Sequence, residues 1–375
     1  MKLCVLTILF AMLSQSVIAR QQMREKSFYF PAEGEWQKVS PESLNLDAAA
    51  LNTALEFAMD RKSSSVILLH KGRILAERHQ DVVSPSRRYQ GTLHGKTALS
   101  HVVEDVASCQ KSVTCVLVGI AQQKGLLSLS DTVQQHLGTG WSQATPEQES
   151  RITLHHLITM TSGLSERLKY VAPAGTKWTY NTTAYSRSLT VVAKAAGMTA
   201  NQVTRKWLTG PLGMNNSKWV DRKLPPDSTV AANRYGFATS ARDLARFGLL
   251  MLANGHWENR VILSDQKFLK SATSPSQKLN PSYGYLWWLN GQQFARRGSR
   301  RATGSLVQTA PKDLFSARGA LGRRCSVSPS RQLVMVRLGD VPDRTGEPQF
   351  DQQFWRLLMK FRSRNRDAIH KTHPE

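Results

Sequence analysis

The feature that most constrains this chain is a helical segment that is apolar on nearly all sides but begins with a polar turn. Ser108 and Lys111 lie in that first turn. The apolar residues that follow them are Val113, Val116, Leu117, Val118, Ile120 and Ala121. A helix with apolar residues all round has to be buried. Its polar first turn must therefore face a cleft or find polar partners.

The spacing of Ser108 and Lys111 suits nucleophilic catalysis. Residues at i and i+3 share one face of a helix, so the hydroxyl and the amine stand together. The helix N-terminus adds positive potential and free N–H donors. These conditions suit an alcohol that loses a proton and a carbonyl oxygen that gains charge. The spacing alone also fits an ordinary first turn. Cys109 is a weaker nucleophile candidate, because it lies about 100° round the helix and has no base beside it.

The pattern along the chain predicts an α/β (α+β) protein with strands near both ends and helices between them. Helices are expected over Leu46–Arg61, Val102–Lys124, Thr153–Thr161, Ala184–Ala196, Asn201–Trp207, Ala241–Ala253 and Phe354–Phe361. Strands are expected over Ser65–Leu69, Ile74–Ala76 and Gln332–Leu338 within a strand-rich region at 283–340. Both termini would then build one sheet, with a helical lobe inserted and a ligand cleft between the two lobes.

The corresponding domain limits follow from this arrangement. A discontinuous sheet-containing lobe is expected at 46–124 plus 266–361, with the nucleophile helix at its border. A mainly helical lobe is expected at 125–265. Residues 20–45 form a lead-in segment, and residues 362–375 form a basic tail.

The first residues have the pattern of an export signal. Lys2 is followed by an uncharged apolar stretch from Leu3 to Leu13, and Val17 and Ala19 suit cleavage after Ala19. The stretch is well short of the ~20 residues that a membrane span needs. We therefore expect residues 1–19 to be a cleaved signal peptide and the product to be periplasmic or secreted.

Charge is the outlier of the composition, with a net charge of +23. Basic residues cluster at Arg296, Arg297, Arg300 and Arg301, at Arg318, Arg323 and Arg324, and from Lys360 to Lys371. Such a surface attracts polyanions. No nucleic-acid-binding motif accompanies the charge, so nucleic acid is not an expected partner. The charge allows an electrostatic association with the anionic envelope, and it also fits a plain solvated surface.

The cysteines and histidines predict neither a disulfide framework nor a metal site. Cys109 and Cys115 lie six residues apart on one expected helix and cannot face each other. His155 and His156 are adjacent, which suits chelation poorly. We expect no metal and no cofactor.

Several motifs in order resemble the class C branch of the serine β-lactamase and penicillin-binding-protein superfamily. Ala107–Ser112 with Val118–Ala121 and Leu127–Asp131 is similar to its nucleophile helix, and Ile152–Leu164 resembles its "ITxxHLLTMTSGL" segment. Pro173–Asn181 resembles its "PGxxWxYxN" region. Further matches are Pro211–Met214 and Ala238–Gly248, so that the resemblance covers roughly residues 45–360. Family VIII esterases and aminohexanoate-oligomer hydrolases belong to the same branch.

The resemblance implies a β-lactamase/transpeptidase-like antiparallel sheet flanked by helices and a hydrolase that needs no cofactor. It implies Ser108, Lys111 and Tyr180 as catalytic residues, with Tyr180 taking the serine proton and passing it to the leaving group. The family motif Tyr-x-Asn reads Tyr180-Asn181-Thr182 here. Asn181 and Thr182 are therefore expected to contact substrate, and the shorter Thr182 puts substrate recognition in doubt.

The third family motif, Lys/His-Thr/Ser-Gly, is best matched by Asp313–Gly322, where Ala317 replaces the lysine. In this alignment the N–H groups of Ala320 and Ser108 form the oxyanion hole, and Gly319 lets the substrate backbone approach. Thr303–Ser305 is a rival alignment. The missing lysine argues against efficient β-lactam or D-Ala-D-Ala hydrolysis.

Arg318 carries a separate hypothesis about the substrate. Placed at the rim of the cleft, it would favour carboxylate-bearing substrates. It would point to the far face of the sheet instead if it follows the alternation of a strand. Both orientations remain open from the sequence.

The sequence as a whole predicts a serine hydrolase acting on a small ester, an oligoamide or a D-amino-acid peptide. The rivals are a cleft protein of the envelope that binds such molecules without turning them over, and a polyanion-binding envelope protein.

Overall fold

The computed structural model of the 375-residue chain describes residues 28–32, 36–222, 234–297, 300–342 and 347–361. The predicted signal peptide at 1–19 and the basic tail at 362–375 lie outside the described residues. Among the described residues there is no helix that is long and apolar enough to cross a membrane.

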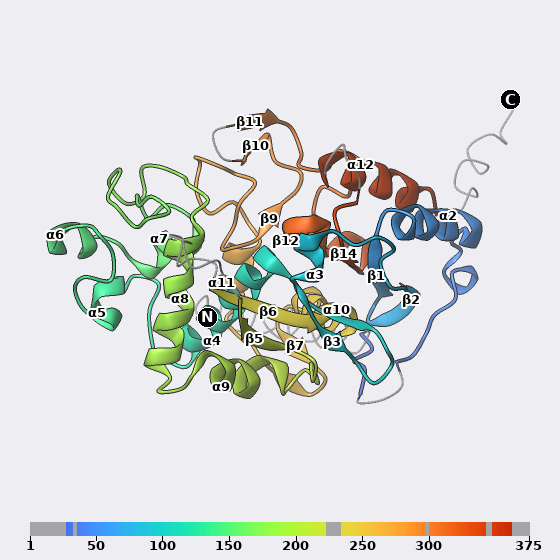
Figure 1. Cartoon of the computed structure of the whole chain (residues 1–375), viewed down its shortest axis with the longest axis horizontal. Coiled ribbons are helices and arrows are strands. Elements are labelled where there is room, and N and C mark those ends of the chain that lie inside the picture. Colours follow the sequence, from blue (N-terminus) through green and yellow to red (C-terminus); the bar gives the residue numbers. More distant parts are fainter. Residues whose placement is uncertain (1–27, 33–35, 223–233, 298–299, 343–346, 362–375) are drawn as a thin grey trace, which may run out of the picture.

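A six-stranded antiparallel sheet built from both ends of the chain forms the centre of the fold (Figure 1). In spatial order its strands are β2 Arg73–His79, β1 Ser63–His70, β14 Leu333–Gly339, β13 Arg323–Ser328, β12 Phe315–Gly319 and β9 Trp288–Leu289. Val336 of β14 lies opposite both Ile67 of β1 and Cys325 of β13. The predicted pairing of strands from the two ends is therefore present.

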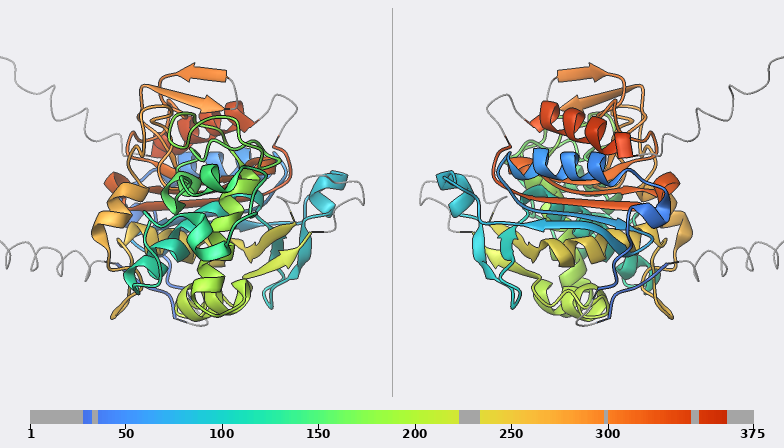
Figure 2. Two further views of the ribbon diagram at one scale, coloured as in Figure 1. Left: turned by 90° about the vertical axis from the view of Figure 1, so that its left-hand side faces the viewer. Right: turned by 90° about the vertical axis from the view of Figure 1, so that its right-hand side faces the viewer.

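Helices cover both faces of this sheet, which confirms the predicted fold class (Figure 2). On one face α2 (Ala48–Met59) and α12 (Glu347–Leu358) pack against side chains such as Val66 and Met335. On the other face α10 (Ala241–Leu252) packs against β14, β13 and β1, and α4 (Gln110–Gln123) packs against β12. Side chains that alternate along β1 and β14 therefore contribute to two apolar cores, one on each face of the sheet.

A second sheet has the strand order β3 (Leu93–Lys96), β4 (Val102–Asp105), β6 (Tyr235–Ser240) and β5 (Lys218–Asp221). Its position corrects one prediction. The helix expected from Val102 begins only after a strand and a turn, because β-branched Val102 and Val103 pair within the sheet instead. β4 leads directly into the turn that carries Ser108.

Helices α5–α9 form the end of the molecule farthest from α2 and β2 (Figure 1). They span Val133–Leu137, Pro146–Glu149, Leu154–Ile158, Thr182–Ala195 and Ala200–Thr204, and a π-helical turn follows at Arg205–Thr209. Threonine capping boxes start α5, α6, α7 and α9, which explains why these short helices begin where they do.

Short elements complete the described chain. Two further hairpins pair β7 His256–Trp257 with β8 Arg260–Val261 and β10 Phe294–Arg297 with β11 Arg300–Thr303. The remaining short helices are α3 Arg87–Gln90, α11 Gln266–Ala272 and the 3-10 turns Glu42–Leu44, Ala107–Cys109, Ala320–Gly322, Pro329–Arg331 and Met359–Phe361.

The predicted lobe limits stay a prediction, and one helix within the range 125–265 packs on the central sheet. The range 125–265 assigned α10 to the helical lobe. The structure packs α10 against β14, β13 and β1 of the central sheet. Its buried Leu244 and Phe247 belong to the same core as Val334.

Candidate active site

The turn that carries Ser108 is held between β4 and α4. Ala107 adopts a positive φ of 50°, an unusual conformation for a residue with a side chain. The Asp105 carboxylate accepts a hydrogen bond of 2.9 Å from the backbone N–H of Ala107. This bond offsets part of the backbone cost and fixes the chain directly before the nucleophile candidate.

Ser108 and Lys111 meet as their spacing predicts. The Nζ of Lys111 donates to the Ser108 hydroxyl oxygen over 3.1 Å and lies 3.4 Å from Oγ1 of Thr182. The amine lies 4.8 Å from the ring centre of Tyr180 and 4.3 Å from that of Tyr185. Its surroundings are therefore a hydroxyl pair and two aromatic faces.

The electrostatics of the site favour a neutral Lys111. The residue is 2% exposed. Burial lowers the pKa of the Lys111 amine to about 7, and the positive charge of Arg222 acts in the same direction, outweighing the negative charge of Glu166. At neutral pH a substantial fraction of the protein therefore carries an uncharged amine beside the serine.

Tyr180 lies next to Lys111, whose Nζ is 4.8 Å from the centre of its ring. Burial raises the pKa of the phenol and outweighs the Ser108 hydroxyl, which lowers it. The ring packs against Tyr283 and Trp288, with centroid distances of 6.2 and 5.9 Å. The phenol is thus held in place by aromatic packing and stays protonated at neutral pH.

The two residues after Tyr180 have different positions. Thr182 opens α8 and lines the pocket next to Lys111. Asn181 is 1% exposed and caps the same helix: its side chain accepts from the N–H of Ala184 and donates to the carbonyls of Leu164 and Ser165. The predicted substrate contact through Asn181 therefore finds no support in the structure.

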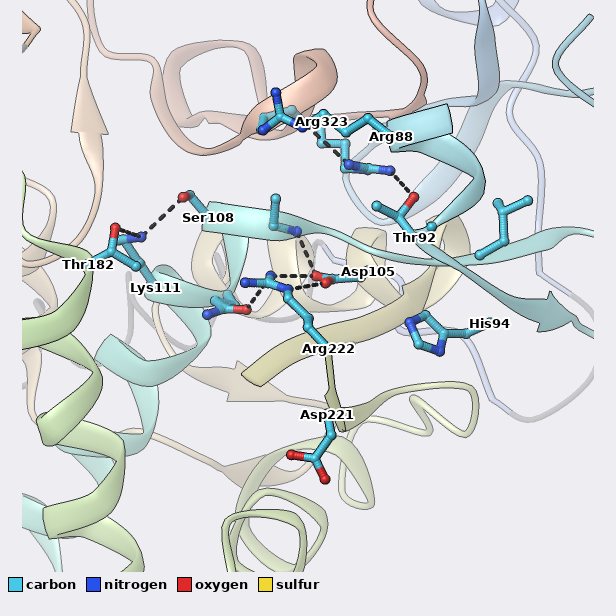
Figure 3. A pocket seen from close by; sticks show the side chains of 15 residues that line it. Arg88, Thr92, His94, Asp105, Ser108, Lys111, Thr182, Asp221, Arg222 and Arg323 are labelled. Carbon is cyan, nitrogen blue, oxygen red and sulfur yellow. Dashed lines mark hydrogen bonds and ion pairs between the residues drawn. The ribbon is translucent and has the colours of Figure 1, made fainter. Parts of the chain in front are cut away.

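A pocket of about 690 Å³ extends from Ser108 between α3, β3 and the end of β5 (Figure 3). The residues that line it are Arg88, Gly91, Thr92, Leu93, His94, Asp105, Ala107, Ser108, Gln110, Lys111, Thr182, Asp221, Arg222, Ala320 and Arg323. Most of these side chains are polar or charged. The pocket therefore suits a polar substrate more than a plain hydrocarbon chain.

The end of β12 lies against the nucleophile turn. A Cβ added to Gly319 would lie 2.2 Å from the carbonyl oxygen of Val106, so this glycine lets two protein backbones approach. We expected the substrate backbone to approach Gly319, but in the structure the backbone of Val106 occupies that space. Ala320 follows directly and lines the pocket with Ser108, as the predicted oxyanion hole requires. Thr303–Ser305, the rival alignment, lies at the end of β11 and after it, outside the pocket lining.

Arg318 does not line the pocket, which corrects the cleft-rim hypothesis. It forms an ion pair with Asp351 of α12, on the far face of the sheet. Arg324, its partner across the β12–β13 pair, reaches the same carboxylate at 3.1 Å. The alternation of the strand decides the orientation.

Sequence reasoning missed a charged network beside the nucleophile. Arg222 pairs with Asp105, with 2.9 Å between Nη2 and Oδ1, and also donates to Gln110 over 3.2 Å. Gln110 in turn donates to the hydroxyl of Tyr185 over 2.6 Å. Burial would raise the pKa of Asp105, but the hydrogen bond and charge of Arg222 hold it below its usual value. Of these residues, only Asp105 lies close enough to Ala107 and Ser108 in the sequence to be suspected as part of the site.

Arg323, one of the basic residues singled out in the sequence near Arg318, lines the opposite wall of the pocket (Figure 3). It is fully buried and donates to Glu104 over 2.6 Å and to Thr92 over 2.7 Å. A longer bond of 3.4 Å reaches the carbonyl of Ala320. Arg323 therefore helps to fix the turn that holds the predicted oxyanion donor.

The thiols and metal-ligating groups lie outside the pocket lining. Cys109, Cys115 and Cys325 are buried free cysteines. Within the described residues, Glu77, His79 and His101 form a group with metal-ligand spacing. Both Glu77 oxygens already accept from Arg242 at 2.7 Å, and the two imidazole rings stack at 3.5 Å. This arrangement is that of a packed ion pair more than of an open metal site.

A family model described as Beta-lactamase matches residues 51–358, so this chain belongs to the β-lactamase family. The match covers most of the chain, including Ser108, Lys111 and Tyr180. The class defined by fold and family is therefore that of the serine β-lactamases and penicillin-binding proteins.

Similarity to individual proteins is lower. Penicillin-binding protein 4* of Bacillus subtilis (strain 168) is 24% identical over 150 residues, which span 33% of this chain and 32% of that relative. A Bacillus anthracis structure described as a candidate 6-aminohexanoate-dimer hydrolase has a TM-score of 0.62 at 15% identity and covers 87% of both chains. EstCE1, described as a hydrolase with promiscuous acyltransferase activity, has a TM-score of 0.59 at 14% identity over 85% of this chain and 99% of its own. These structures share the fold.

Proposed function

We propose that the chain is a serine hydrolase that cleaves an ester or amide through an acyl-enzyme on Ser108. One observation carries the proposal: the Ser108 oxygen lies 3.1 Å from the Nζ of the buried Lys111 at the edge of a pocket. Family membership supports the same reaction class.

The pKa directions support Lys111 as the first proton acceptor. Its pKa of about 7 provides neutral amine at physiological pH, whereas the raised pKa of Tyr180 keeps the phenol protonated. Neutral Lys111 takes the Ser108 proton as the oxygen bonds to the substrate carbonyl carbon. The N–H groups of Ser108 and Ala320 then stabilise the oxyanion. This order differs from the implied role of Tyr180 as first acceptor.

Collapse of the tetrahedral intermediate releases the alcohol or amine. Tyr180 donates its hydroxyl proton to the leaving group and is reprotonated from the Lys111 ammonium. Water then attacks the acyl-enzyme while Lys111 accepts one of its protons. The carboxylic acid departs and the Ser108 hydroxyl is restored, so that one water is consumed per bond cleaved.

The departures from the family motifs guide the choice of substrate. Ala317 replaces the cationic residue of the third motif and is itself buried. The lysine-free motif favours small esters or oligoamides over β-lactams. The names of the aminohexanoate-dimer hydrolase and of EstCE1 are consistent with this choice.

The proposal is tested with a panel of acyl donors, comprising nitrophenyl esters, linear amides, nitrocefin and D-Ala-D-Ala peptides. We expect ester or amide turnover that falls by roughly three orders of magnitude or more in Ser108→Ala. Ser130→Ala, an exposed serine outside the pocket lining, is the matched control and should keep full activity. Turnover that is equal in wild type and Ser108→Ala would contradict Ser108 as the nucleophile, and no turnover by the folded wild type would favour a binding protein.

We also propose export, with cleavage after Ala19, on the basis of the apolar stretch after Lys2. The N-terminal sequence of protein recovered from its native cell tests this. A start at Arg20 in an extracytoplasmic fraction is expected, and an intact Met1 in the cytoplasm would contradict it.

A further inference from the structure

Among the described residues, one guanidinium of the pocket lining has no carboxylate partner. Arg88 is exposed and lines the pocket, and no hydrogen bond or ion pair joins it to another of the described residues. The other two guanidinium groups of the lining differ, because Arg222 is paired with Asp105 and Arg323 with Glu104. Arg88 is thus the guanidinium available to a ligand.

Arg88 is carried by a short helix that is firmly anchored. Ser86 caps α3 and donates to both carboxylate oxygens of Asp340 at 2.7 and 2.8 Å. Tyr89, the next residue after Arg88, is 2% exposed and contacts Glu104. The backbone of Arg88 is therefore fixed at the pocket edge while its side chain faces solvent. A fixed backbone with a guanidinium that is unpaired among the described residues suits the recognition of a ligand more than structural support.

The charges of the pocket are separated in space. Figure 3 places Arg88 on the same side as Arg323 and places Asp221 on the opposite side, beyond Arg222. His94 adds no charge at neutral pH, because burial first and the nearby Lys218 and Arg222 lower its pKa, outweighing Asp105. An anionic group on a substrate attached to Ser108 would therefore turn towards Arg88.

We propose that Arg88 is a specificity-determining residue that selects acyl substrates bearing a carboxylate. This inference rests on the proposed hydrolase function and names its substrate class. A guanidinium presents two parallel N–H donors that match the two oxygens of a carboxylate. Because Arg88 is exposed, salt weakens the attraction.

The test compares isosteric esters that differ only in the charge of the acyl end. The probes are 4-nitrophenyl monoesters of adipic, pimelic and suberic acid and the matching terminal carboxamides. We expect kcat/KM to be about fivefold higher for the carboxylate at the best chain length, a size typical of an exposed charge contact. The preference should vanish in Arg88→Gln and reverse towards a terminal ammonium in Arg88→Glu.

Arg87→Gln is the matched control, because Arg87 is an exposed neighbour on the same helix outside the pocket lining. It removes the same charge and should keep the preference. Turnover of both esters with no preference, or with a preference that survives Arg88→Gln, overturns the role of Arg88 and leaves the hydrolase intact. No turnover of any ester or amide by the wild type overturns the hydrolase and this inference together.

Discussion

Two regions of the molecule bury positive charge in opposite ways. On the far face of the sheet, Arg318 and Arg324 share the Asp351 carboxylate of α12. At the nucleophile turn, Lys111 is as deeply buried but has hydroxyls and aromatic rings around it, and no carboxylate pairs with it among the described residues.

The difference teaches what each buried charge can do. A buried charge with a fixed partner stays ionised and ties two elements together, here β12–β13 and α12. A buried amine without one loses affinity for its proton, and the pKa of Lys111 falls to about 7. The first arrangement supports the structure and the second supports proton transfer. Removing each charge should therefore have opposite consequences.

The largest expected effect is on activity at the nucleophile turn. Lys111→Met should lower kcat/KM of the best substrate by about three to four orders of magnitude, because serine, lysine and tyrosine act as a unit. Stability should be unchanged or higher, since an apolar side chain replaces a buried amine. Kinetics and urea unfolding measure both quantities.

Lys124→Met, at the exposed end of the same helix, is the control for Lys111→Met and should change neither quantity greatly. A Lys111→Met protein that unfolds at lower urea would show a structural role for the lysine, and one that keeps its activity would exclude a catalytic role.

The next effect concerns stability at the far face. Asp351→Asn leaves two buried guanidinium groups without their carboxylate and should lower the free energy of unfolding by about 3–5 kcal/mol. Activity per folded molecule should be retained. Asp81→Asn removes the exposed Lys96–Asp81 pair and should cost about 1 kcal/mol or less. Equal losses in both variants would contradict the structural role of Asp351.

The smallest effect in the comparison is the pH dependence. Because Lys111 must be neutral to accept the serine proton, kcat/KM for an uncharged ester should rise about tenfold per pH unit below pH 7 and level off above it. The sign follows from the lowered pKa, which places the active neutral form on the alkaline side. A rate that falls as pH rises through 7 would argue that the ammonium form is the active one.

Local patterns in the sequence predicted some of these features and not others. The pairing of Ser108 with Lys111 followed from helix spacing, and the approach of Tyr180 from the family resemblance. The orientation of Arg318 could not be predicted, because the alternation of side chains along β12 does not say which face of the strand is turned towards Ser108.

Contacts over long sequence distances could not be predicted. Arg222 and Asp105 are 117 residues apart in sequence and meet only because β5 joins the sheet of β4 through β6. Arg88 belongs to no recognisable sequence motif. It lies at the pocket only because Ser86 and Tyr89 fix α3 there through contacts with residues that are distant or separate in the sequence. The apolar pattern of α4 continues backwards into Val102 and Val103 and so predicts a helix there, where the structure has the strand Val102–Asp105.

The most direct test of the account is to locate the covalent adduct formed by a fluorophosphonate. The full-length protein is labelled, digested and sequenced by mass spectrometry, with Lys111→Met labelled in parallel. We predict a single adduct on Ser108 in the wild type, formed much more slowly in Lys111→Met. Labelling at Cys109 or at another serine, or an unlabelled Ser108 in folded protein, would contradict the central claim.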